Sequence, residues 1–302
     1  MPVLVASDLD RTLIYSESSL ALPAPQAPPG PGAALGPEAG EAGAEAGPES
    51  ALLARETPPA VPRLLCVEMY GGKPLSYLTE TAARLLTELA DAAVFVPATT
   101  RTREQYLRID LPGPAPAYAV CANGGHLLVD GVPDPDWRAL VTARLADECA
   151  PLGEVRAHLA QTADPAWARK HRIADDLFAY LVVERELLPE DWVKELAEWA
   201  ENRGWTVSLQ GRKIYAVPKP LTKSAAVREI ARRAGAEPTL AAGDSLLDAD
   251  LLLAADRGWR PGHGELADSG WTAPTVSALT VGGVLAGERI LREFLRAVRQ
   301  GA

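Results

Sequence analysis

The feature that most constrains the fold of this chain lies at its start, where the apolar residues 3–6 lead into Asp8, Asp10 and Thr12. Four small or branched apolar residues in succession are typical of a strand that is buried on both faces, as in a parallel sheet. In open α/β sheets, ligands bind beyond the carboxyl ends of the strands. The stretch therefore predicts an α/β fold with a site at the end of its first strand.

The two carboxylates of this stretch suggest its chemistry. Asp8 and Asp10 are two residues apart and could share one hard cation. A carboxylate can also attack phosphorus. For this stretch alone, a solvent-exposed loop after a strand is the alternative. An EF-hand loop is excluded, because Leu13 stands at its sixth position, where glycine is required, and Ser19 at its twelfth, where glutamate is required.

The composition limits the binding partners and the cellular compartment that we expect for this protein. The chain has 302 residues and a formal net charge of −10, enough length for one large α/β domain and a smaller one. The acidic balance argues against a nucleic acid or an anionic membrane as partner and favours a small soluble substrate. With no basic amino-terminal region and no apolar run near the roughly 18 residues of a membrane span, we predict a cytoplasmic protein. The oligomeric state stays open.

One segment differs sharply from the rest in composition. Residues 18–62 hold ten Pro, six Gly and five Glu, and no aromatic residue. So little apolar surface cannot offset the entropy of ordering, and we predict a disordered or loosely extended insert. The three cysteines, Cys66, Cys121 and Cys149, form no CxxC pair or Cys/His cluster. They predict reduced thiols in the core rather than a disulfide framework or a zinc site.

The rest of the chain reads as two interleaved domains. A hairpin around Gly71 and Gly72 precedes a β-α-β pattern typical of a parallel sheet. The pattern then becomes a mixed α+β one, with helices at 136–149, 152–161 and 189–202 and strands at 167–173, 177–183 and 206–210. Afterwards a helix capped by Thr222 and Gly235, a strand at 239–242 and a closing helix at 284–298 complete the first domain. We therefore predict core residues 1–132 and 212–302 around an inserted domain at 133–211.

Polar clusters fall at strand ends or at a helix start, in a fixed order. Their order and spacing resemble the haloacid dehalogenase (HAD) superfamily, whose motifs run DxDxT, a Ser or Thr after the second strand, a Lys, and GDxxxD. The inserted domain, with the Asn123-Gly124 turn before it, resembles a type II cap. The nearest groups are the Cof-type, sucrose-phosphatase-like and mannosyl-3-phosphoglycerate phosphatase-like enzymes. The clusters are Asp8, Asp10 and Thr12; Thr99 and Thr100; Lys223; and Asp244 and Asp248.

The resemblance implies a Rossmann-like, doubly wound parallel sheet with an inserted α+β cap. It also implies a Mg²⁺-dependent phosphatase that hydrolyses a small phosphorylated metabolite, sugar-phosphate-like, through an aspartyl-phosphate. Asp8 would be the nucleophile, and Asp10 would protonate the leaving oxygen and later deprotonate water. Mg²⁺ would be held by Asp8, the Asp10 backbone carbonyl and Asp244, with support from Asp248.

The same resemblance assigns further roles. Thr99 and Lys223 would bind the transferring phosphoryl group. Substrate would be contacted by Thr12, Thr100, Arg101, Asn123 and Gly124. Two departures from the motifs are Arg11, where the family often has Gly, and Leu247, where Asn is common. A phosphotransferase or mutase using the same aspartyl-phosphate, and a non-catalytic binding module, remain alternatives.

The densest basic run of this acidic chain falls in the inserted domain, at residues 167–172. On an alternating strand, Arg169 and His171 share one face, and Lys170 and Arg172 share the other. We predict that one of these faces contacts the polar leaving group of the substrate. A merely solvated strand face is the alternative.

Overall fold

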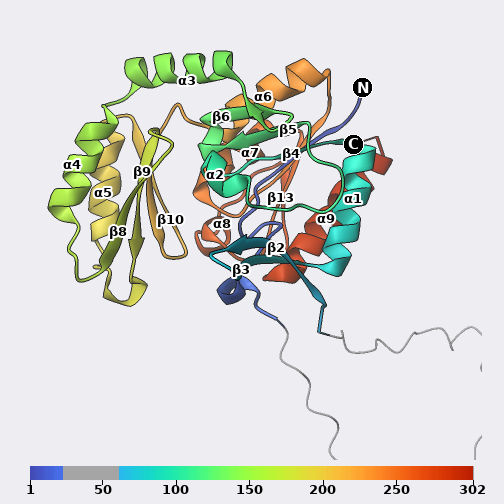
Figure 1. Cartoon of the computed structure of the whole chain (residues 1–302), viewed down its shortest axis with the longest axis horizontal. Helices are drawn as coiled ribbons and strands as arrows, with labels where there is room; N and C mark the ends of the chain where they lie inside the picture. Colours follow the sequence, from blue (N-terminus) through green and yellow to red (C-terminus); the bar gives the residue numbers. More distant parts are fainter. Residues whose placement is uncertain (23–60, 302) are drawn as a thin grey trace, which may run out of the picture.

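A computed structural model describes the protein over residues 1–22 and 61–301. Its centre is a parallel sheet in the order β14-β13-β12-β1-β4 (Figure 1). Leu4 of β1 pairs with Val94 on one side and Thr239 on the other. Because the strands are parallel, their carboxyl ends meet at one edge. The strands are β1 (Leu4–Ser7), β4 (Val94–Pro97), β12 (Thr239–Ala242), β13 (Arg257–Arg260) and β14 (Val276–Ala278).

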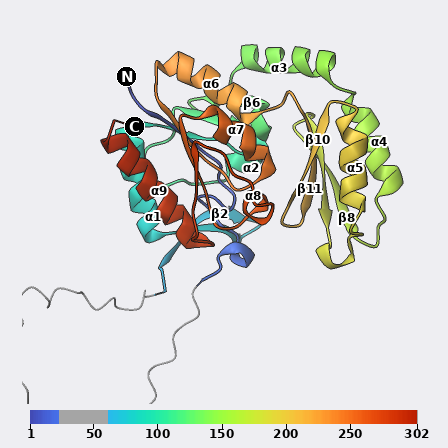
Figure 2. The same ribbon diagram turned by 180° about the vertical axis from the view of Figure 1, so that it is seen from behind.

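Helices cover both faces of this sheet, which confirms the predicted doubly wound core. On one face α1 (Glu80–Ala92) and α9 (Val284–Arg299) lie side by side (Figure 2). The other face carries α6 (Lys223–Ala234) and α7 (Ala249–Ala254). Successive β1 side chains serve these two cores alternately: Val5 packs in the cluster that contains α9, and Leu4 in the cluster that contains α6. This is why the run at 3–6 is apolar throughout.

Smaller sheets flank the centre. The predicted hairpin forms from β2 (Leu64–Tyr70) and β3 (Lys73–Thr79), and positive φ angles of 57° and 75° at its two turn glycines fit the tight connection. An antiparallel sheet in the order β5-β6-β7 lies beyond β4, and a bridge between Ala98 and Val120 joins it to the parallel sheet. Its strands are β5 (Tyr118–Cys121), β6 (His126–Val129) and β7 (Val132–Pro133).

The inserted region forms a separate antiparallel sheet in the order β10-β11-β9-β8. Helices α4 and α5 cover the face of this sheet turned away from the core. Helix α3 extends from the core to the inserted region along the top of the view (Figure 1). The elements are α3 (Pro135–Glu148), α4 (Leu152–Thr162), β8 (Ala168–Ala174), β9 (Phe178–Val183), α5 (Trp192–Glu201), β10 (Trp205–Gln210) and β11 (Lys213–Pro218).

Strand β11 lies on the other side of the predicted boundary at residue 211. It is hydrogen-bonded between β10 and β9, with Tyr215 opposite Ser208 on one side and Tyr180 on the other. The sheet of the inserted region therefore extends to Pro218. Extended apolar residues look alike in sequence whichever sheet they join, so the pattern alone did not assign this strand. The division into domains stays a prediction.

The start of the predicted insert is ordered, contrary to our expectation for residues 18–62. A short 3₁₀ helix spans Glu17–Ser19, and Leu20 is 7% exposed. Leu20 packs in a cluster with Tyr15 and Val284, and its carbonyl accepts the Val284 N–H at 2.9 Å. Burial of this apolar side chain explains the order. Residues 23–60 of the predicted insert lie outside the described residues.

Two further expectations can be compared with the structure. Cys121 is buried as predicted, but Cys66 is exposed, because it lies on the outer side of the β2–β3 hairpin; all three cysteines are free. Among the described residues, no helix combines the length and the apolar character needed to cross a membrane. The short helices α2 (Arg103–Tyr106) and α8 (Glu265–Asp268) were not predicted.

Candidate active site

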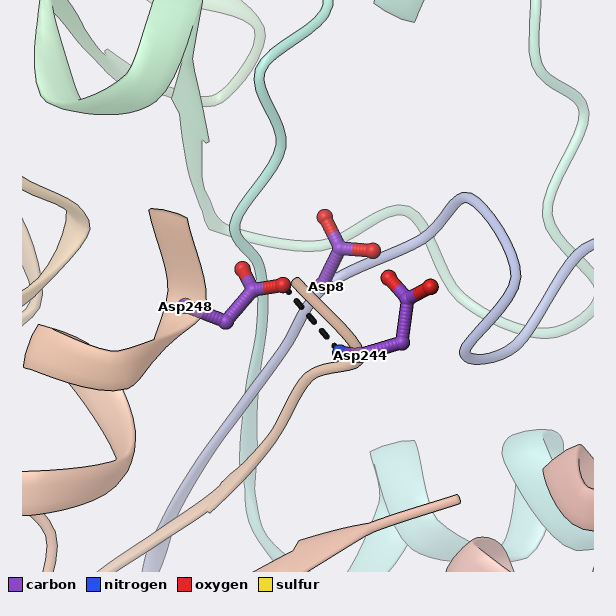
Figure 3. A group of neighbouring side chains, drawn as sticks. All are labelled: Asp8, Asp244 and Asp248. Carbon is purple, nitrogen blue, oxygen red and sulfur yellow. Dashed lines mark hydrogen bonds between the residues drawn. The ribbon is translucent and has the colours of Figure 1, made fainter. Parts of the chain in front are cut away.

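Three buried carboxylates meet at the carboxyl edge of the parallel sheet. Asp8 follows β1, whereas Asp244 and Asp248 follow the neighbouring strand β12. One oxygen from each lies within 4.8 Å of the others. Figure 3 shows the carboxylates of Asp8 and Asp244 beside each other, with Asp248 turned toward the backbone of Asp244. The sequence predicted this grouping, and the adjacency of the two strands produces it.

Lys223 supplies the central positive charge. It is the first residue of α6, and the Thr222 side chain caps that helix by accepting the Ala225 N–H, as predicted. The fully buried Lys223 ammonium donates to Asp8 Oδ1 at 2.6 Å and to Asp248 Oδ1 at 2.5 Å. Burial acts to lower the pKa of Lys223, but the two carboxylates raise it above its usual value. The lysine is therefore a fixed cation.

Asp248 has both carboxylate oxygens engaged. Its Oδ2 accepts the backbone N–H groups of Asp244 at 3.1 Å and Ser245 at 2.9 Å, and the Ser245 hydroxyl at 2.7 Å. Its Oδ1 accepts from Lys223. Asp248 thus fixes the loop that carries Asp244 and the position of the lysine. Within the described residues, the Asp244 side chain accepts no hydrogen bond, whereas the Asp8 side chain accepts from Lys223 and from Thr12.

The cluster carries more negative than positive charge. Burial raises the pKa of Asp8 to about 7, against the lowering effect of Lys223. Burial also raises the pKa of Asp244, aided by Asp8 and Asp248. The second cation within reach is Arg11, whose Nε lies 3.6 Å from Asp244 Oδ2. Hard oxygen donors with an excess of buried negative charge fit a divalent cation such as Mg²⁺.

Asp10 lies in a different electrostatic environment from Asp8, although only two positions separate them in the sequence. Arg101 grips it bidentately, with Nε donating to Oδ2 and Nη2 to Oδ1, both at 2.7 Å. Burial favours the neutral acid, but the guanidinium outweighs it and lowers the pKa of Asp10. The two carboxylates of one motif therefore differ in protonation tendency: the pKa of Asp8 is raised and that of Asp10 is lowered.

The predicted threonines line the same edge. The Thr12 hydroxyl donates to Asp8 Oδ2 at 3.3 Å. Thr99 and Thr100 follow β4, whose end is joined to β1 by the bond from Ala98 N–H to the Ser7 carbonyl. Both threonines are buried, and Thr99 Oγ1 accepts the Arg101 N–H at 3.1 Å.

Asn123 and Gly124 contact the segment before Lys223. Asn123 has a left-handed φ of 55°, and its Nδ2 donates to the Leu221 carbonyl at 2.7 Å. A Cβ at Gly124 would lie 2.1 Å from the Thr222 carbonyl oxygen, so only glycine permits this close approach. Among the described residues, Asn123 Oδ1 is buried without a hydrogen-bond partner. The contacts of Asn123 and Gly124 therefore position the start of helix α6, which carries Lys223.

The two departures from the motifs have distinct structural settings. Arg11 is held at a left-handed φ of 62° by its N–H bond to the Ile14 carbonyl and by His263 Nε2 on its own carbonyl. His263 Nδ1 accepts the Gly283 N–H, which places the ring proton on Nε2. Leu247 is buried in the core cluster. Neither departure displaces the carboxylates.

Contacts between the core and the inserted region involve residues that the sequence did not single out. Glu265 of α8 accepts from the Ser208 hydroxyl at 2.7 Å and the Leu209 N–H at 3.1 Å, both in β10. On the other side, Asp175 accepts the Arg103 N–H at 3.0 Å. Neither acidic residue belongs to a motif or an apolar period, so these contacts only become visible in three dimensions.

One face of the antiparallel sheet is turned to the core. Ser208, Tyr215, Tyr180 and Arg172 stand opposite one another in successive strands and so share a face, and Ser208 reaches the core through Glu265. Lys213 lies on that face, 5.8 Å and 5.9 Å from the ring centroids of the two tyrosines. A separate cavity of about 580 Å³, between α4 and the strands β8 and β9, is lined by His171 and Arg172 of the basic run but by none of the motif residues.

Comparisons with known proteins agree with this architecture. Neither a family model nor a curated protein matches the sequence. Among solved structures, the sucrose-phosphatase of Synechocystis superposes with a TM-score of 0.56 and 16% identity, over 72% of this chain and 93% of that one. A Thermoplasma acidophilum protein gives a TM-score of 0.55 and 13% identity, over 98% and 99%.

A third similar structure is a subclass IIB sugar phosphatase of the HAD superfamily, with a TM-score of 0.50 and 13% identity over 99% of both chains. This chain has the HAD fold. The predicted fold class is thereby confirmed: a parallel α/β core with an additional antiparallel sheet. At such low identity the HAD fold is what these proteins share, so activity must be argued from the site.

Proposed function

We propose that this HAD-fold protein is a Mg²⁺-dependent phosphatase that hydrolyses a small, sugar-phosphate-like metabolite through an aspartyl-phosphate. The observation that carries the proposal is the buried cluster of Asp8, Asp244, Asp248 and Lys223 at the carboxyl edge of the sheet. The proteins of similar fold include a sucrose-phosphatase and a sugar phosphatase. A solvent-exposed loop, the alternative for the first motif, would not bury three carboxylates and a lysine together.

The residues present fit a magnesium ion. Asp8 and Asp244 would hold it through side-chain oxygens, together with the Asp10 backbone carbonyl, and Asp248 would fix the loop behind them. When bound, Mg²⁺ would neutralise negative charge on the phosphate and on the attacking carboxylate. A carboxylate needs this help, because an anionic phosphate ester repels an anionic nucleophile.

In the first half-reaction, a carboxylate oxygen of Asp8 attacks phosphorus, and the bond between phosphorus and the leaving oxygen breaks. The leaving oxygen takes a proton from Asp10. Lys223 and the Thr99 hydroxyl stabilise the transferring phosphoryl group, and Thr12 orients Asp8 through its bond to Oδ2. The alcohol departs and an aspartyl-phosphate remains on Asp8.

In the second half-reaction, water attacks the phosphorus of the aspartyl-phosphate. Asp10 removes a proton from this water, the acyl phosphate bond breaks, and inorganic phosphate leaves. The Asp8 carboxylate and the protonated Asp10 are restored together, so the cycle closes without a further reagent.

The inserted region would recognise the rest of the substrate. Lys170, Arg172 and Lys213 share the sheet face that is turned to the core, so we assign leaving-group contact to this face rather than to that of Arg169 and His171. Cations and tyrosines are suited to polar, oxygen-rich alcohols. The substrate is thus proposed to be a small phosphorylated metabolite.

The direct test is turnover of p-nitrophenyl phosphate by the purified protein, with Mg²⁺ and with excess EDTA. We expect release of p-nitrophenol and phosphate in equal amounts, and only with Mg²⁺. Transfer of phosphate to an added alcohol in preference to water would point to a phosphotransferase or mutase. Absence of turnover, with a set of phosphorylated metabolites as well, would favour a non-catalytic binding module.

A further inference from the structure

The β2 strand contains a buried acidic residue that the predicted hairpin does not explain. Glu68 stands between Val67 and Met69, and its side chain is fully buried. The pairing of β2 with β3 shifts register on both sides of Glu68. Such bulges re-aim a side chain and are over-represented next to active sites. Here the bulge turns a carboxylate toward the core.

The Glu68 carboxylate is held tightly where it points. Its Oε2 accepts from Arg101 Nη1 at 2.7 Å and from the Ser76 hydroxyl at 2.6 Å. Ser76, on the partner strand β3, also accepts from Arg101 Nη2 at 3.2 Å. Two side chains of the hairpin therefore accept hydrogen bonds from the terminal nitrogens of the Arg101 guanidinium.

The other edge of the same guanidinium grips Asp10. Its Nε and Nη2 each donate to a different oxygen of Asp10. A guanidinium is planar and rigid, so fixing one edge fixes the direction of the other. Glu68 thereby sets the orientation of the Asp10 carboxylate, although it does not touch it. The resemblance would instead have Arg101 contact the substrate, but its donors are already directed to Asp10, Glu68 and Ser76.

We propose that Glu68, acting through Arg101, is a positioning residue for Asp10 during proton transfer to the leaving oxygen. The inference rests on the proposed phosphatase function. Small displacements of a catalytic group are costly: about 1 Å can lower the rate about 100-fold. Replacing Glu68 should therefore affect the proton-transfer step and leave ground-state binding of the phosphate to Lys223 and the metal largely intact.

Two substrates with different leaving groups can distinguish a positioning role of Glu68 from a merely structural one. p-Nitrophenolate departs readily without a proton, whereas phenolate is more basic and depends more on a general acid. The two aryl phosphates have nearly the same shape, and kcat/KM covers only the first half-reaction, so the ratio of their kcat/KM values reports proton transfer to the leaving oxygen rather than fit or the shared hydrolysis of the aspartyl-phosphate. A loss of fold or of active enzyme would lower both kcat/KM values by the same factor.

The experiment compares wild type, Glu68→Gln and Glu293→Gln with both esters at saturating Mg²⁺. Glu293 is a matched control, because it is a buried, arginine-paired glutamate on α9, away from the cluster. For Glu68→Gln we expect kcat/KM to fall roughly 30-fold on phenyl phosphate and about threefold on p-nitrophenyl phosphate. For Glu293→Gln the ratio of the two kcat/KM values should equal that of wild type.

An equal fall on both esters, or no fall, would overturn the proposal. If Glu68→Gln fails to fold, Ser76→Ala keeps every charge and removes one bond to Glu68 and one to Arg101. It should shift the kcat/KM ratio in the same direction by a smaller factor, and an unchanged ratio would be decisive against the proposal. Failure of the proposed function is seen separately, because wild type would then turn over neither ester.

Discussion

The two sides of the proposed active site are built in opposite ways. On the core side, Asp8, Asp248 and Lys223 are buried, and each charge is hydrogen-bonded to another. On the side of the inserted region, Lys170 and Arg172 are exposed and make no hydrogen bond or ion pair within residues 1–22 and 61–301. One side is a rigid network, and the other is a row of free cations.

This difference follows from what each side would have to recognise. Burying charges costs free energy, and a partly satisfied network is worse than an apolar core. Such a network is justified only for a group of fixed geometry, such as a phosphoryl group. A leaving group varies between substrates, and exposed long side chains can adapt to it. The chemistry should therefore reside in the core and the choice of substrate in the inserted region.

The largest expected effect tests the core side. Asp8→Asn should keep the fold and lower turnover at least about 10⁴-fold, because the amide is not a nucleophile and no other group replaces it. Circular dichroism would check the fold, and trapping with a phosphoryl analogue should require Asp8. Substantial Mg²⁺-dependent activity in a clean preparation of this variant would remove Asp8 from the mechanism.

The second expected effect concerns the metal. Mg²⁺ should raise the melting temperature of wild type, because a ligand that binds only the folded state stabilises it. Asp244→Asn should abolish this rise and the heat of Mg²⁺ binding in calorimetry, since it removes one of the two side-chain carboxylates proposed to hold the ion. Asp91→Asn, at an exposed position on α1, is the control and should behave as wild type. Equal Mg²⁺ affinity in all three proteins would exclude this site.

The core side was also the more predictable one. Asp8, Lys223 and Asp244 each follow a local signal: a buried strand, a capped helix start or a second strand. The parallel topology then has only one edge at which to gather them. By contrast, Glu68 and Ser76 reach Arg101 through a bulge, and register cannot be read from the pattern of apolar residues. The sequence offered only one hint, an acidic residue within the apolar stretch of β2.

The inserted region was less predictable for a related reason. Its helices and strands were located within a few residues, but the face of β8 that is turned to the core depends on tertiary contacts. The bond from Ser208 to Glu265 decides it. Strand β11 was placed with the core, because an extended apolar segment fits either sheet. Leu20 was missed because a single buried leucine is invisible in a segment dominated by proline and glycine.

The third prediction tests whether the inserted region selects the substrate. Replacing Lys170 and Arg172 together by Ala should lower kcat/KM for the natural substrate roughly tenfold to a hundredfold, as expected for losing two contacts of about 0.7–1.4 kcal/mol each. Activity on p-nitrophenyl phosphate should change less than about twofold. The matched pair Arg169→Ala and His171→Ala should leave both activities near wild type. Equal, small effects of both pairs would make this strand a scaffold.

A smaller effect is expected on folding stability when the pH is lowered. Burial lowers the pKa of His263 below its usual 6.5. The unfolded histidine therefore binds a proton more readily than the folded one, so stability should fall as the pH drops below about 6.5. His263→Gln can still donate to Arg11 and accept from Gly283 but does not titrate, so it should lose less stability. Urea midpoints at pH 5.5 and 7.5 would show this; identical pH dependence in both proteins would contradict it.

The smallest effect is expected for the other insertion into the core, between β1 and β2. Residues 23–60 offer few large apolar side chains to bury, so replacing them with a short Gly/Ser linker should change melting temperature and turnover little. Extending the replacement to 18–62 should cost more, about 1.5–3 kcal/mol of unfolding free energy, because it also removes the buried Leu20.

Leu20→Ala in the full-length chain tests the same explanation with a single side chain. It should reproduce most of the difference between the two linker variants, since Leu20 is the only large apolar residue of 17–22 that is buried in the described structure. Thermal melts and p-nitrophenyl phosphate turnover of all three variants would be compared. Unfolding or loss of activity on replacing 23–60 alone would mean that this segment contributes to the fold or to the site, and that both insertions serve the core.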